Sequence, residues 1–62
     1  MTDMVTVLLD VEVALHQAIE RWGSDVPQDV LVKLSKALAL ASQNPEMAEE
    51  IILSVSEFVG NP

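Results

Sequence analysis

The 62-residue sequence predicts an all-α fold, in which three short helices form a small bundle that a second copy of the chain completes. Three observations support this prediction. Apolar residues recur at steps of three and four in three separate segments, which is the period of an amphipathic helix. Residues that start and stop helices bound each segment. Half of the residues are apolar, which is more than a single small core of short helices can easily hide.

The first helix is predicted over residues 3–22. Thr2 or Asp3 can cap its N-terminus, and Gly23 follows its last apolar residue, where a glycine often ends a helix. Its main apolar stripe consists of Met4, Leu8, Val11, Leu15, Ala18 and Trp22. Further apolar residues lie outside this stripe, namely Val5, Val7, Leu9 and Val13. The N-terminal half is therefore apolar most of the way round, and we expect more than one neighbour to cover it.

The second and third helices are predicted over residues 26–42 and 45–59. Pro27 suits the first turn of the second helix, while Asn44 and Pro45 supply an N-cap and a first helical residue for the third. The expected buried residues are Val30, Leu31, Leu34, Ala37, Leu38 and Ala41, followed by Ala48, Ile51, Ile52, Val55, Phe58 and Val59. Both connections are short, so consecutive helices should fold back on each other within one domain spanning residues 1–62.

Residues 4–9 also permit a second interpretation as a short strand, because Val5, Val7 and Leu9 alternate with other residues. The residues that support it are the segment MVTVLLD and, after it, Leu15, Ile19, Gly23 and Val30. With this strand the chain resembles the ribbon-helix-helix family of transcriptional regulators and antitoxin components. The resemblance implies strands that pair across a dimer and present side chains to DNA bases. Here those side chains would be Thr6, Leu8 and Asp10, so a relative that does not bind DNA is the better expectation.

The charge balance restricts the partners. Ten acidic residues against three basic ones give a net charge of −7, which argues against nucleic acid and anionic membranes and favours a basic or apolar protein surface. The chain has no cysteine for a disulfide or a thiolate metal site. It has no apolar run of membrane-spanning length, and Asp3 lies where a signal peptide would carry a base, so we expect a cytoplasmic location.

No catalytic, cofactor-binding or metal site is predicted. His16 is the only residue whose ordinary pKa suits a base at neutral pH, and its helical neighbours Glu12 and Glu20 supply no nucleophile for it to activate. Neither glycine belongs to a phosphate-binding loop, and no acidic loop has the spacing of a calcium site. We therefore expect no enzyme activity, no cofactor and no small-molecule substrate.

The remaining candidates are interaction surfaces. The predicted self-association interface is Met4, Val5, Leu8, Val11, Leu15 and Trp22, and the candidates for binding a basic partner are Glu46, Glu49, Glu50, Leu53 and Glu57. The sequence predicts a non-enzymatic protein–protein interaction module, such as a small adaptor, inhibitor or regulatory subunit, that acts as a homodimer. The alternative is a regulator or antitoxin component of the ribbon-helix-helix type.

Overall fold

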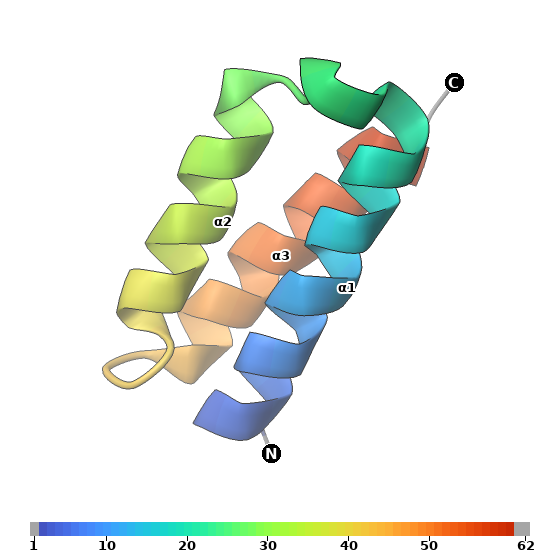
Figure 1. Ribbon diagram of the computed structural model, residues 1–62. Helices are drawn as coiled ribbons and strands as arrows, with labels where there is room; N and C mark the ends of the chain where they lie inside the picture. Colours follow the sequence, from blue (N-terminus) through green and yellow to red (C-terminus); the bar gives the residue numbers. More distant parts are fainter. Residues whose placement is uncertain (1, 61–62) are drawn as a thin grey trace.

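The computed structural model describes residues 2–60, which form three α-helices in an up-down-up arrangement (Figure 1). The elements are α1 (Met4–Trp22), a single 3-10 turn η1 (Gly23–Asp25), α2 (Gln28–Leu40) and α3 (Pro45–Gly60). In the view of Figure 1, α1 and α2 lie in front and α3 lies behind them. The predicted all-α bundle of three helices is confirmed for the described part of the chain.

The alternative strand over residues 4–9 is wrong. These residues form the first turns of α1, and residues 2–60 contain no strand. The buried residues of α1 are Val7, Val11, Ala14 and Ala18, which follow the period of a helix and not the alternation of a strand. The strand on which the resemblance to the ribbon-helix-helix family rested is therefore absent from the described residues.

Side-chain caps start α1 and α3. The Oδ1 atom of Asp3 accepts a hydrogen bond of 2.8 Å from the backbone N–H of Thr6, and this bond holds the pKa of Asp3 below its usual value. Asn44 acts similarly for α3, since its Oδ1 accepts from the backbone N–H of Met47 at 3.3 Å. Of the two candidate caps for the first helix, Asp3 is the one that makes the bond. Pro45 is the first residue of α3, as predicted.

Helix α2 is shorter at both ends than the predicted 26–42. Residues 23–25 form the 3-10 turn, and Pro27 occupies the N-cap position, with its carbonyl accepting from the backbone N–H of Val30 at 3.1 Å. At the other end, the carbonyl of Leu40 accepts from the backbone N–H groups of Gln43 and Asn44. Asn44 precedes Pro45, and the residue before a proline disfavours the helical conformation, so α2 cannot run on through Asn44 into α3.

The core consists of one buried face from each helix. Its members are Val7, Val11, Ala14, Ala18, Val30, Leu34, Ala37, Ala41, Ala48, Ile52, Val55 and Val59. Several larger side chains that the periodicity placed in the core are about half exposed, among them Leu31, Leu38 and Phe58. The core is built mainly from valine and alanine, so the helices pack closely and leave bulkier aliphatic residues at the surface.

Candidate interaction surfaces

The residues predicted for self-association do not share one surface. Met4, Val5 and Leu8 are exposed, and Leu15 and Trp22 are half-buried against the core. Val11 is only 6% exposed and belongs to the core of the single chain. The buried residues of α1 are Val7, Val11, Ala14 and Ala18. The predicted stripe contained Leu8 and Leu15 instead of Val7 and Ala14, so it was displaced by one residue at those two turns.

One side of α1 faces α3. Arg21 donates hydrogen bonds from its guanidinium to the carbonyl oxygens of Phe58, at 3.2 Å, and Val59. The carboxyl of Asp10 also meets α3, at Glu49. Successive residues of a helix are turned by about 100° about its axis. Leu8 and Ile19 therefore lie on the other side of the core face from Asp10 and Arg21, away from α3 and toward α2.

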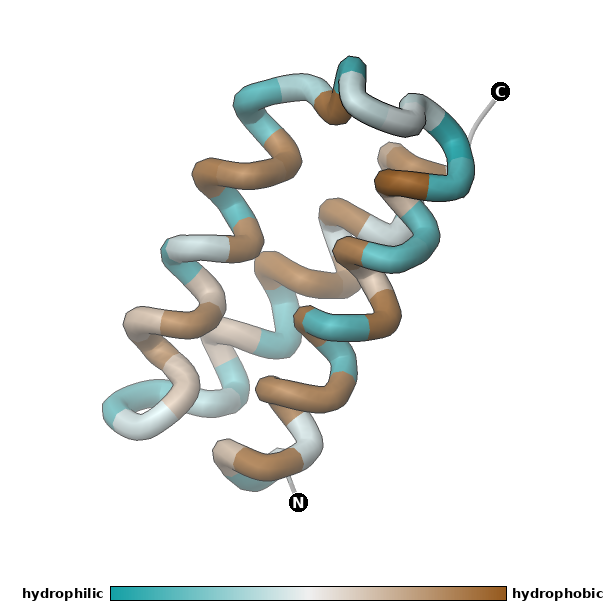
Figure 2. The backbone as a smooth tube through the Cα atoms, in the orientation of Figure 1, coloured by the Kyte–Doolittle hydropathy of each residue, from teal (hydrophilic) through white to brown (hydrophobic). Residues whose placement is uncertain are grey.

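The same reasoning orients α2. Its Lys33 and Lys36 line a pocket shared with α3, so Leu31 and Leu38 lie on the side turned toward α1. The two helices together present an apolar surface, which we call the α1–α2 face: Met4, Leu8, Leu15, Ile19, Leu31 and Leu38. Figure 2 shows hydrophobic segments recurring along both helices. All of these residues except the half-buried Leu15 are exposed, and Glu12 borders the face on its outer edge.

A second surface runs along the outside of α3. Glu46, Glu50, Leu53 and Glu57 follow the spacing i, i+4, i+7, i+11, so they form one continuous line, here called the α3 ridge. All four are exposed, and the Leu53 side chain is 58% exposed between the carboxylates. Four of the five residues predicted to bind a basic partner therefore lie together.

Glu49, the fifth of these residues, lies apart from the ridge at the contact between α3 and α1. It is half-buried, and while both carboxyls are ionised its buried Oε2 atom finds no donor among residues 2–60. A hydrogen bond with the Asp10 carboxyl, which requires one of the two groups to be protonated, raises the pKa of Glu49 above its usual value; burial and the Asp10 charge add to the effect. The sequence offered no signal for this pair, because Asp10 and Glu49 come from different helices.

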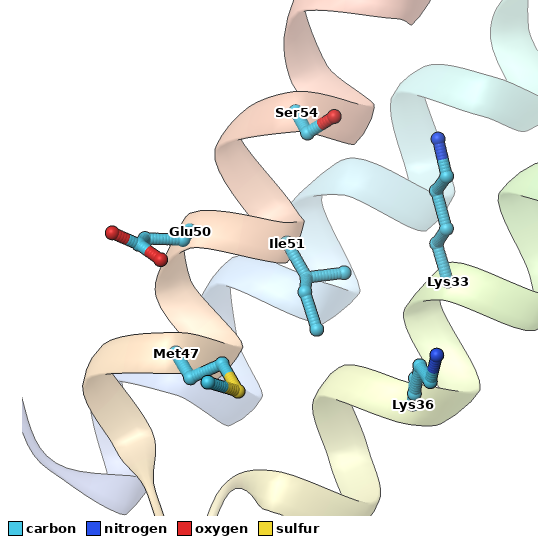
Figure 3. A pocket seen from close by; sticks show the side chains of 6 residues that line it. All are labelled: Lys33, Lys36, Met47, Glu50, Ile51 and Ser54. Atoms are coloured by element: carbon cyan, nitrogen blue, oxygen red, sulfur yellow. The ribbon is translucent and has the colours of Figure 1, made fainter.

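A pocket of about 300 Å³ lies between α2 and α3 and was not predicted. Figure 3 shows Lys33 and Lys36 extending from α2 beside the gap, with Met47 and Ile51 on α3 and Glu50 pointing away from it. Ser54 completes the lining. Neither lysine forms an ion pair with a group in the described part of the chain. The pocket is open and small, and its lining shows that both lysines of α2 lie on the α3 side of that helix.

The outer side of α1 holds the only histidine. A shallow hollow of about 510 Å³ is lined there by Leu9, Glu12, Val13, His16, Gln17 and Glu20. This set contains no serine, threonine or cysteine that His16 could activate. Across residues 2–60, no three His, Cys, Asp or Glu residues are placed to hold a metal ion.

Comparison with family models, curated proteins and solved structures finds no match for this chain. Within the described residues, each helix is too short or too polar to cross a membrane. The surfaces described above are therefore the basis on which a function is argued.

Proposed function

We propose that this protein is a non-enzymatic interaction module that works as a homodimer and binds a basic partner protein on the α3 ridge. The observation that carries the proposal is the unbroken line of Glu46, Glu50, Leu53 and Glu57 along the exposed side of α3. A regular line of acids around one exposed leucine offers both charge and an apolar contact to a binding partner.

The partner that suits this ridge is an amphipathic basic helix. Its Lys or Arg residues would meet the three carboxylates, and an aliphatic residue would cover Leu53. Exposed ion pairs contribute only about 0–1 kcal/mol each, so the contact at Leu53 must supply much of the affinity. The charge accelerates association, since a net charge of −7 attracts a basic chain at long range.

Two features support a function without catalysis. His16 is surrounded in its hollow by glutamates, a glutamine and aliphatic residues, with no nucleophile to activate. The α2–α3 pocket holds two lysines beside Met47 and Ile51, and Glu50, the one acid in its lining, points away from the gap (Figure 3). An adaptor, inhibitor or regulatory subunit needs neither.

Affinity capture from the native host with a matched pair of variants tests the partner. One bait carries Glu46→Gln, Glu50→Gln and Glu57→Gln, and the other carries Glu12→Gln, Glu20→Gln and Asp25→Gln, which removes the same charge elsewhere. We expect a basic protein to be retained by the wild type and the second bait and lost from the first. Capture of the same proteins by all three baits, or of no basic protein, contradicts the proposal.

A defined probe gives a second measurement. A labelled helical peptide with a leucine stripe flanked by lysines should bind the wild type with a dissociation constant that rises steeply with salt. Leu53→Ala should weaken this binding, whereas Val13→Ala, at a similarly exposed residue of α1, should not. Sedimentation equilibrium at micromolar concentration tests the homodimer separately, and a strictly monomeric wild type would contradict that part.

A further inference from the structure

The contact surface of the proposed homodimer can be located on the outside of α2. We propose that a second copy of this chain docks on the outer side of α2 and the adjoining α1–α2 face, with α2 meeting α2 across a two-fold axis. This inference rests on the homodimer proposed above and names its interface. It differs from the sequence-based interface, which lay entirely on α1.

The solvent-facing line of α2 carries no charge. Its members are Gln28, Val32, Ser35 and Ala39, all exposed, and we call this line the neutral ridge of α2. The three charged residues of α2, Asp29, Lys33 and Lys36, line pockets shared with α3 and so lie on the other side. The neutral ridge and the α1–α2 face adjoin each other at Leu31 and Leu38.

This absence of charge decides which partner fits. Two chains of net charge −7 repel each other wherever their carboxylates approach within the screening length of about 8 Å at physiological salt. At the neutral ridge that repulsion is smallest, because the acids of the α3 ridge point elsewhere and Glu12 lies only at the far edge of the α1–α2 face. A basic partner would gain no ion pair here. An acidic chain can approach through an uncharged side of its own, and a second copy of this chain presents such a side.

Packing supports the same choice. Leu31, Val32 and Leu38 are 46%, 54% and 48% exposed in the single chain, so each has apolar surface left to bury. Ser35 and Ala39 lie between them on the ridge and are small, which lets two helices approach to about 8 Å between axes. Aliphatic side chains on either side of small ones form the ridges and grooves that helix pairs require.

The area required sets the extent of the interface. A stable dimer buries about 800 Å² per partner. The described chain exposes 4296 Å² in all, so the contact must cover roughly a fifth of its surface. The neutral ridge of α2, with four residues, is too narrow for this. The adjoining Met4, Leu8 and Ile19 of α1 widen the contact to one broad side of a molecule whose Cα extents are 30 × 17 × 15 Å.

Two exposed aliphatic residues form a matched test. Val32→Glu places a charge on the neutral ridge, and Leu53→Glu places the same charge on the α3 ridge. Neither residue belongs to the core, so both variants should keep the helical circular dichroism spectrum of the wild type. By sedimentation equilibrium, Val32→Glu should raise the dimer dissociation constant at least about 10-fold, and Leu53→Glu should leave it within about 2-fold. A Val32→Glu dimer as tight as the wild type would show that the interface lies elsewhere while the homodimer itself stands.

The absence of cysteine allows a second measurement. Single-cysteine variants Val32→Cys, Ser35→Cys and Ala39→Cys place thiols along the neutral ridge, and Ser54→Cys places one on α3. A disulfide between copies needs Cα atoms within about 7 Å, which residues near a two-fold axis satisfy. At least one ridge variant should form a covalent dimer under mild oxidation much faster than Ser54→Cys. Equal rates in all four variants would overturn the proposed interface.

Discussion

Trp22, the last residue of α1, stacks on Phe58 near the end of α3, with ring centroids 5.8 Å apart and planes inclined by 26°. The guanidinium carbon of Arg21 lies 4.8 Å from the centre of the Trp22 ring, and its NH1 atom donates to the carbonyl oxygens of Phe58 and Val59. The first and last helices are therefore joined at this end of the bundle by one aromatic pair and one arginine.

The aromatic pair should show measurable coupling. We expect Trp22→Leu and Phe58→Leu each to lower the free energy of unfolding, and the double variant to lose about 0.5–1.5 kcal/mol less than the sum, because the stacking is lost only once. Urea unfolding followed by far-ultraviolet circular dichroism measures this without the tryptophan signal. Combining Trp22→Leu with Leu53→Ala serves as the control and should be additive.

Arg21 should stabilise the end of α3. The last carbonyl groups of a helix have no partner within it, and Arg21 supplies hydrogen bonds to two of them while placing a positive charge at the negative helix end. Arg21→Gln should lower the free energy of unfolding by about 1 kcal/mol and accelerate amide hydrogen exchange in the last turn of α3. Lys36→Gln, which removes a charge at a residue without an ion pair in the described chain, should do neither.

Glu49 should make stability depend on pH. Its pKa is raised in the folded chain by its hydrogen bond with the Asp10 carboxyl, by burial and by the Asp10 charge. The stabilisation is therefore fully present below the ordinary pKa of a glutamate and is lost as pH rises through the higher folded-state pKa. Glu49→Gln mimics the protonated form, so we expect it to raise the melting temperature at pH 7 by a few degrees, corresponding to about 0.5–1 kcal/mol.

The comparison across pH separates this pair from general charge effects. At low pH the wild type and Glu49→Gln should converge, because Glu49 is then protonated in both states. Glu50→Gln, the neighbouring residue on the α3 ridge, should change the melting temperature less and with a weaker dependence on pH. A parallel pH profile for wild type and Glu49→Gln would contradict the role given to the Asp10–Glu49 contact.

The two glycines should respond oppositely to alanine. Gly23 ends α1 with φ 63° and ψ −124°, a conformation that a Cβ atom disfavours although nothing lies within 4 Å of it. Gly23→Ala should cost about 1–2 kcal/mol through the backbone alone. Gly60 is helical, has open space around it and no positive φ, so Gly60→Ala should be neutral or stabilise by up to about 0.5 kcal/mol. Chemical denaturation of both variants measures the difference.

Structural features that depend on residues close together in the sequence could be predicted from the sequence. Asn44 and Pro45 were expected to start α3 and do so, because a cap bonds to an amide only three residues away. The acidic line on α3 was also visible, since residues spaced by three and four share a helix face; only Glu49 falls outside it. The bounds of α2 were less accurate because residues 26–27 form the connection after η1 and residues 41–42 belong to the turn before Pro45, although their side chains permit a helix.

By itself, the sequence determined that this protein is built from three helices and that α1 and α3 carry its acidic charge. It also determined where each helix starts and stops to within about two residues. Those properties arise from hydrogen bonds, dihedral preferences and side-chain types within a turn or two. Only the tertiary structure decided which face of α1 is buried, since that helix is apolar most of the way round and the packing of α2 and α3 selects Val7 and Ala14 over Leu8. It also decided that Glu49 meets Asp10 and that Leu31 and Leu38 remain at the surface, because both outcomes depend on how separate helices approach each other.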